Sequence, residues 1–219
     1  MLCSSHICTL QNEIAFPQSL ETEGIVRIPS GQLKTKKLQM KRNILVYGLI
    51  SGVLVSTFML ISMGYVSHCE GSVDYDTSML IGYASMLIAF SLVYVGIRNY
   101  RNKYQGGVIS FGRAFKIGIL IVLIASTLYV IAWMIDYFFF MPDFMDKYSA
   151  HAIDKLKAEG ASQLKIDKES KELADMARMY KNPLFTALYT YAEILPVGLI
   201  VTLISSLILK RKEQVKLSF

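Results

Sequence analysis

Four long apolar stretches constrain this chain more than any other feature of its sequence. Residues 44–66 and 77–97 carry no charged side chain, residues 117–137 carry Asp136 near their end, and residues 184–209 carry Glu193. As α-helices at 1.5 Å per residue, each stretch is about 30 Å long or longer, which matches the thickness of a bilayer's hydrocarbon core. The sequence therefore predicts four transmembrane helices.

The overall composition supports a membrane protein and not a nucleic-acid-binding one. The chain is 53% hydrophobic and 18% charged, with a mean hydropathy of +0.40, whereas soluble domains have about 45–50% apolar and about 25% charged residues. The net charge of +6 comes from basic residues that lie just outside the apolar stretches, where lipid headgroups are found. We therefore expect the lipid bilayer as the partner and no nucleic acid.

The distribution of Lys and Arg predicts the orientation in the membrane. Basic residues without acids precede the first span in residues 34–42 and fill the second loop in residues 98–116, and they dominate the tail in residues 210–216. The first loop, residues 67–76, has acids but no Lys or Arg. Because basic residues stay on the cytoplasmic side of a membrane, we expect both termini in the cytoplasm.

The segments outside the four spans differ in character. We expect residues 1–39 to be a disordered extension, with the natural start at Met40, because this segment is polar and interrupted by prolines. The membrane domain is predicted over residues 40–212, with a short cytoplasmic tail at 213–219. Residues 141–182 have apolar side chains at helical spacing on both sides of Gly160, which predicts a helical hairpin, and the orientation above places it outside the cell membrane. The predicted fold is all-α: a four-helix membrane bundle with this hairpin between the third and fourth spans.

No pattern in the sequence points to a catalytic, cofactor or metal site. The cysteines form no CxxC pair and the histidines show no metal-ligand spacing (Cys3, Cys8, Cys69, His6, His68 and His151). Strings typical of serine hydrolases, zinc proteases or nucleotide-binding proteins are absent from the sequence. We therefore expect no enzyme activity and no cofactor.

Glu193 is the one acid well inside a span, and acids in the membrane are candidates for function. Pro196 follows it by three residues and predicts a kink, because proline frees the carbonyl of Ala192. Three interpretations stay open: a protonated structural carboxyl, a proton- or ion-coupling group, and an acid at the outer interface. In the structural interpretation Glu193 donates a hydrogen bond to a neighbouring helix, with acceptors at matching depth in Ser62, Tyr83, Ser85 or Tyr129.

Two further groups of residues are candidate sites. Arg98, Arg101, Arg113 and Lys116 lie at the cytoplasmic ends of the second and third spans. They either set the topology with side chains that reach the headgroups or bind an anionic lipid headgroup. Gly48, Gly52 and Ser56 form a stripe of small residues, which predicts a face where another helix packs closely.

Several short strings occur in an order that resembles a known family. They are Tyr47-Gly48-Leu49-Ile50-Ser51-Gly52, Gly96-Ile97-Arg98-Asn99-Tyr100-Arg101, Gly106-Gly107, Ser110-Phe111-Gly112-Arg113-Ala114-Phe115-Lys116, Lys181-Asn182-Pro183 and Glu193-Ile194-Leu195-Pro196-Val197-Gly198. Together they resemble the bacterial membrane proteins of domain of unknown function 4199. The resemblance implies an inner-membrane protein with a periplasmic third loop. It implies no activity, because none is established for that family.

Three classes of function remain open from the sequence. The favoured one is a structural protein or an accessory subunit, in a membrane complex or a homo-oligomer, because four spans with a single interior acid offer little chemistry. A small proton- or ion-coupled transporter that uses Glu193 is the first alternative. A membrane sensor that detects periplasmic signals through residues 141–182 is the second.

Overall fold

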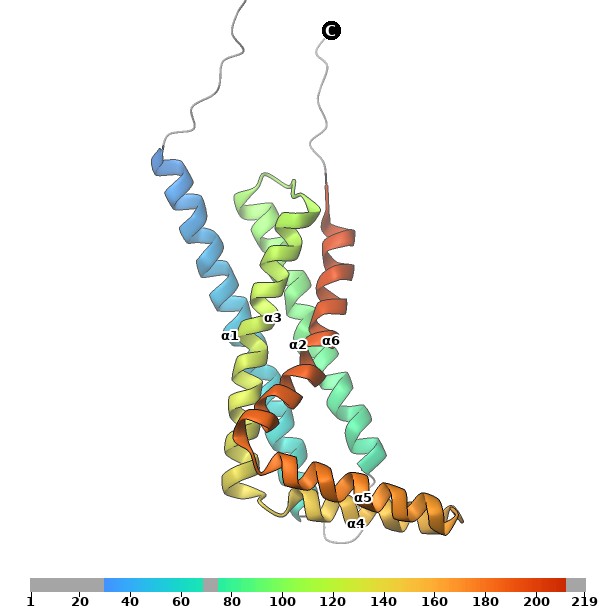
Figure 1. The fold of residues 1–219 in the computed structure, drawn as a ribbon. Coiled ribbons are helices and arrows are strands. Elements are labelled where there is room, and N and C mark those ends of the chain that lie inside the picture. The colour runs from blue at the N-terminus through green and yellow to red at the C-terminus, as the bar shows by residue number, and fades with distance from the viewer. Residues whose placement is uncertain (1–29, 69–74, 212–219) are drawn as a thin grey trace, which may run out of the picture.

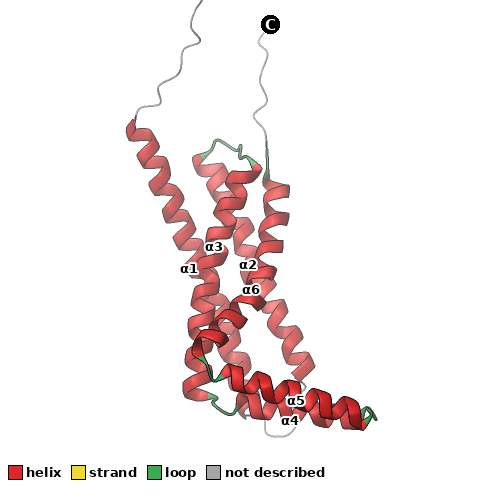
Figure 2. Ribbon diagram, viewed as in Figure 1, coloured by secondary structure: helices red, strands yellow, loops and turns green. Residues whose placement is uncertain are grey.

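The computed structural model describes residues 30–68 and 75–211, and within these ranges the chain is almost entirely helical (Figure 2). Four of the helices are long and apolar enough to span a membrane, and two shorter ones form a hairpin between the third and fourth spans. The predicted all-α architecture is thus confirmed. The helices are α1 (Ser30–His68), α2 (Tyr75–Tyr104), α3 (Phe111–Ile135), continued by the π-helical turn η1 (Asp136–Phe140), α4 (Phe144–Ala158), α5 (Gln163–Tyr180) and α6 (Pro183–Leu209).

The start of α1 differs from the sequence prediction. The helix begins at Ser30, so residues 30–39, which we expected to belong to a disordered extension, are helical. The physical reason lies in the sequence after Gly31: residues 32–39 contain Gln, Leu and Lys, all good helix formers, and no helix breaker before the apolar stretch. The predictions for residues 1–29, for the tail at 213–219 and for Cys3, Cys8, His6 and Cys69 fall outside the described residues.

The four spans form a bundle with one internal core. α2 and α3 pack against each other, and α1 and α6 each pack against both of them. Large, fully buried side chains of the core come from all four spans: Val55, Phe90, Ile97, Ile117, Ile121 and Ile194. Many other Leu and Ile side chains of the spans remain exposed on the outer surface, which suits a surface that faces lipid.

The stripe of small residues on α1 lies against α3. A Cβ atom added to Gly48 would meet Cβ of Ile124 at 2.8 Å, and one added to Gly52 would meet Cα of Ala125 at 3.0 Å. Real side chains do not approach this closely, so the backbones of α1 and α3 can come together here only because these positions lack side chains. Ser56, one turn further along, is buried as well.

Polar side chains of α1 bind the backbone of α2. The Asn43 amide donates to the carbonyl of Gly96 at 3.0 Å and accepts from the Asn99 amide at 2.9 Å. The Ser51 hydroxyl donates to the carbonyl of Ala89 at 2.8 Å. Because these atoms are buried or half-buried, each bond also satisfies a polar group away from water.

The bundle end at which α1 begins and α6 stops is held together by backbone contacts. The loop between α2 and α3 turns at Gly106 and Gly107, whose φ angles of 59° and 86° favour glycine. Ile109 of this loop exchanges two hydrogen bonds, of 3.2 and 2.9 Å, with Arg211 just after α6. We call this region the terminal end of the bundle (Figure 1).

The hairpin of α4 and α5 runs across the opposite end of the bundle and not along it (Figure 1). The two helices pack side by side and are joined by a turn at Gly160, which has a φ angle of 72°. Near the hairpin, Phe139 and Phe140 of η1 are 79% and 74% exposed, as expected of aromatic residues at a membrane interface. We call this region the hairpin end.

Candidate functional site

A bend in α6 shapes the hairpin end of the bundle. Pro196 lies inside this helix, where it has no N–H to donate and frees the carbonyl one turn earlier. The helix changes direction in its middle, and its first half leans away from the neighbouring end of α2 (Figure 1). Glu193 therefore lies on the half of α6 that has been displaced from α2.

A large cavity fills this end of the bundle. Its volume is about 620 Å³, and it is partly open to the surroundings. All four spans and both hairpin helices contribute to its wall. Ligand-binding cavities in proteins have volumes of about 300–1,000 Å³, so the space is large enough for a small molecule.

The wall of the cavity is rich in aromatic and methionine side chains. The aromatic ones come from five helices: Tyr83, Tyr129, Trp133, Phe144, Tyr148, Tyr180 and Tyr189. The methionines also come from different helices: Met59, Met63, Met86, Met145 and Met176. Methionine is flexible and polarisable and adapts to ligands of different shapes. A wall rich in methionine therefore suits a binding site that accepts more than one ligand shape.

Glu193 faces this cavity with every acceptor that the sequence analysis considered. Ser62, Tyr83, Ser85 and Tyr129 all line the same space. The Tyr83 hydroxyl forms a hydrogen bond with the Glu193 carboxyl group, while the Ser85 hydroxyl donates to the carbonyl of Gly82 at 2.7 Å. Glu193 lines the cavity and is exposed, so its carboxyl group is accessible to a small molecule.

A second carboxyl group, not considered in the sequence analysis, borders the cavity from the hairpin. Glu169 of α5 lines the same cavity, on the side formed by the hairpin. Among the described residues that line the cavity there is no Lys, Arg or His, so both ionisable acids lack a basic partner in its wall. The cavity therefore has an acidic character inside a largely apolar wall.

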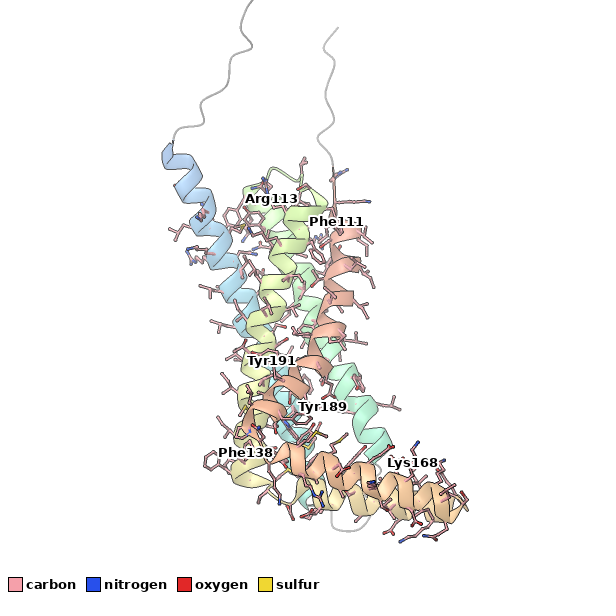
Figure 3. All side chains as sticks on the ribbon, in the orientation of Figure 1. Phe111, Arg113, Phe138, Lys168, Tyr189 and Tyr191 are labelled. Atoms are coloured by element: carbon pink, nitrogen blue, oxygen red, sulfur yellow. The ribbon has the colours of Figure 1, made fainter. Side chains whose placement is uncertain are left out.

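Contacts between aromatic rings attach the hairpin to the spans. Tyr180 at the end of α5 lies 5.7 Å from Tyr137 and 5.5 Å from Tyr189, measured between ring centroids. Phe144 at the start of α4 contacts Trp133 edge to face at 5.3 Å. Figure 3 shows Tyr189 close to the hairpin. Burial raises the pKa of Tyr180 above its usual value, so this phenol stays neutral.

The connection from the hairpin to α6 is also fixed locally. Asn182 caps α6 by accepting a hydrogen bond from the backbone N–H of Leu184 at 3.0 Å, and Pro183 occupies the first turn. The Thr186 hydroxyl donates to the carbonyl of Tyr180 at 2.9 Å. These bonds set the direction in which the chain leaves the hairpin, and with it the position of Glu193 over the cavity.

The basic residues of the sequence analysis lie at the terminal end, far along the bundle from the cavity. Arg101 donates to the carbonyl of Leu209 at 3.3 Å, where a cation complements the C-terminal end of α6. Arg113 donates to the side chain of Gln105 at 2.6 Å. Arg98 and Lys116 are exposed. Two of the four thus have structural partners, and lipid binding by the group stays a prediction.

Asp136 is a buried acid that appears in the sequence analysis only as a charge near the end of the third apolar stretch. It is 8% exposed, and its Oδ2 atom has no hydrogen-bond partner in the described part of the chain. The signal was present in the sequence, because this acid directly continues an apolar run and is followed by four aromatic residues. Asp136 is not among the residues that line the cavity.

Metal binding receives no support from the described residues. Within residues 30–68 and 75–211, His, Cys, Asp and Glu form no group of three that could hold a metal ion. The cavity instead combines an apolar wall, hydroxyl groups and two carboxyl groups, which suits the binding of an organic molecule.

Comparison with known proteins gives one match. No curated protein and no solved structure matches the chain. Residues 46–211 match the family described as "Protein of unknown function (DUF4199)". This match includes most of the first span, the whole of the other three and the hairpin between the third and fourth. It also includes every residue that lines the cavity, and on its extent the chain belongs to the DUF4199 family.

Proposed function

We propose that this protein is a non-enzymatic binding protein of the inner membrane that takes up a small amphipathic molecule at its hairpin end. The observation that carries the proposal is the cavity of about 620 Å³ between the spans and the hairpin. A purely structural bundle gains nothing from such a space, because unfilled volume weakens packing. The function resembles that of a sensor, with the hairpin as the part that responds to the ligand.

The contacts of the hairpin support this role. α4 and α5 provide one side of the cavity, and their attachment to the spans depends on a few aromatic contacts around Tyr180 and Phe144. A ligand that touches both the spans and the hairpin therefore changes the stability of this attachment. A ligand can shift a conformational equilibrium only through such differential contacts.

The proposal places the hairpin in the periplasm and both termini in the cytoplasm. Support comes from the basic residues of the loop between α2 and α3 and of the segment after α6, which share the terminal end. A reporter that is active only in the periplasm should be active when fused after Gln163 and silent when fused after Phe219. The reverse pattern would place the cavity on the cytoplasmic side.

Proton- or ion-coupled transport is a second candidate, favoured by one observation. The carboxyl group of Glu193 lies one turn before the break at Pro196, and broken helices beside polar groups occur at the binding sites of transporters. Transport requires that Glu193→Gln abolish net movement of the substrate across the membrane. Binding without transport would leave the sensor-like role.

The chain contains a single tryptophan, and this residue, Trp133, lines the cavity. Its fluorescence therefore reports occupancy directly. The neutral amphiphile N-phenyl-1-naphthylamine accepts energy from tryptophan, and we expect it to quench Trp133 in a saturable manner when the protein is in lipid nanodiscs.

Two glycine variants make this experiment specific for the cavity. Gly82 lines the cavity, and a Cβ atom added there meets no atom within 4 Å, so Gly82→Phe should fold and fill the space. Gly64 is equally open but does not line the cavity, so Gly64→Phe is the matched control. We expect saturable quenching in the wild type and in Gly64→Phe and its loss in Gly82→Phe. Equal quenching in all three proteins would overturn the proposal.

A further inference from the structure

We propose that the ligand of the cavity is a lipophilic cation: a molecule with a bulky apolar or aromatic body and one positive charge. This inference rests on the proposed function, since it names the chemical class of the molecule that the cavity binds. Binding of such a ligand depends on the size of the cavity and also on the carboxyl groups of Glu193 and Glu169, which recognise the positive charge.

The charge of the cavity wall favours a cation. The two acids among the described residues that line the cavity are carboxyl groups, one on α6 and one on α5, and Lys, Arg and His are absent from these residues. A bound cation supplies the missing countercharge. In a site partly shielded from water this attraction is stronger than at a surface. An anion would face two acids and no base, so the wall selects against it.

The aromatic side chains of the wall favour a cation as well. Tyr83, Tyr129, Trp133 and Tyr189 surround the space into which Glu193 faces. The faces of such rings attract cations, with tryptophan the strongest of the natural side chains, and the effect increases when the cation loses water. Aromatic walls with a carboxyl group thus bind an organic cation through both its charge and its apolar body.

The two acids belong to different parts of the molecule. Glu193 belongs to the spans and is hydrogen-bonded by Tyr83, whereas Glu169 belongs to the hairpin. A cation between them contacts both parts of the molecule. Binding therefore strengthens the attachment of the hairpin to the spans, which gives the proposed response a physical basis.

The test uses two probes of nearly equal size and shape and of opposite charge, tetraphenylphosphonium and tetraphenylborate. Each is titrated into the protein in nanodiscs of neutral lipid, with the fluorescence of Trp133 as the readout and empty nanodiscs as the correction for partitioning into lipid. We expect saturable quenching by tetraphenylphosphonium only. Glu193→Gln should weaken its binding about ten-fold, as expected for the loss of roughly one charge-assisted contact.

Two controls separate a charge effect from misfolding. Glu193→Gln should melt at nearly the same temperature as the wild type, because the amide retains a donor and an acceptor. Glu172→Gln removes a negative charge from α5 at a position that does not line the cavity, and it should bind tetraphenylphosphonium as the wild type does. Glu169→Gln should weaken binding less than Glu193→Gln, because Glu169 belongs to the hairpin, which the proposed function treats as the part that responds to the ligand.

The outcomes distinguish this inference from the function on which it rests. If the neutral amphiphile binds in the cavity but the two charged probes bind equally well, or if Glu193→Gln leaves tetraphenylphosphonium binding unchanged, the cation assignment is wrong and the binding function stands. If neither the neutral amphiphile nor tetraphenylphosphonium binds, both are wrong.

Discussion

The two ends of the bundle are built in opposite ways. At the terminal end and through the middle of the bundle, glycines let α1 and α3 meet closely, amides and hydroxyls join α1 to α2, and a backbone bridge joins Ile109 to Arg211. At the hairpin end, large aromatic and methionine side chains enclose a cavity of about 620 Å³. Small side chains specify one arrangement of the helices, whereas large flexible ones leave space that a ligand can use.

The largest effect should come from disturbing the closely packed region. Gly52→Leu places a side chain where an added Cβ already lies 3.0 Å from Cα of Ala125, so α1 and α3 must separate. Overpacking of this kind destabilises proteins by about 1–3 kcal/mol, and we expect a lower melting temperature in detergent. Gly64→Leu on the same helix, where an added Cβ meets no atom within 4 Å, is the control. Identical melting of the two variants would refute close packing at Gly52.

A smaller and more local effect is expected at the hairpin end. Tyr180→Leu removes ring contacts with Tyr137, Phe185 and Tyr189, each worth about 0.5–1.5 kcal/mol beyond the burial of area. The hairpin should detach more often, so a protease should cut the turn at Gly160 faster. Leu164→Ala, at a position 82% exposed, should leave cleavage unchanged. Unchanged cleavage of Tyr180→Leu would mean that these rings do not hold the hairpin.

The polar contacts between α1 and α2 should matter less than the close packing of α1 and α3. Asn43→Leu removes hydrogen bonds to Gly96 and Asn99, and interhelical bonds in membrane proteins contribute about 0.6 kcal/mol on average. We expect a small decrease in melting temperature, clearly below that of Gly52→Leu. Thr57→Ala, at an exposed position of the same helix, is the reference. If Asn43→Leu lowers the melting temperature as much as Gly52→Leu does, the polar contacts between α1 and α2 matter as much as the close packing of α1 and α3, which contradicts the prediction.

The smallest effect concerns an ion pair on the hairpin surface. Lys147 lies 2.8 Å from Asp143, and its hydrogen bond holds the pKa of that carboxyl below its usual value. A carboxyl pKa that is lowered by folding stabilises the native state at neutral pH, and this contribution is lost as the pH falls through the lowered value. Lys147→Ala should raise the pKa of Asp143 in an NMR titration without a measurable change in melting. An unchanged pKa of Asp143 in Lys147→Ala would mean that Lys147 does not lower this pKa.

The spans and the hairpin could be predicted because their signals are local. A helix that crosses a bilayer needs only a long apolar stretch, and the turn at Gly160 needs only a break between two helical patterns. The start of α1 at Ser30 was missed because we gave Pro29 and Gly31 more weight than the helix formers that follow them. The position of the hairpin was not predictable at all, since it depends on rings far apart in sequence, such as Tyr137 and Tyr180.

The candidate site was predictable in part for the same reason. Glu193 and Pro196 stand out in the sequence because an acid and a proline are unusual inside an apolar stretch. Matching depths in the membrane also selected Ser62, Tyr83, Ser85 and Tyr129, and these residues do line the cavity with Glu193. Glu169 could not be selected, because its place depends on how the hairpin folds back across the bundle. The chemical role of Glu193 stays a prediction.

The bridge between Ile109 and Arg211 has a mechanical consequence. Its two hydrogen bonds connect the segment after α6 with the turn between α2 and α3, and Arg101 adds a third connection through the carbonyl of Leu209. Tension applied to the chain beyond Arg211 is therefore divided between the last turn of α6 and the loop that leads into α3. A protein or tag that pulls on this tail therefore acts on α2, α3 and α6 at once.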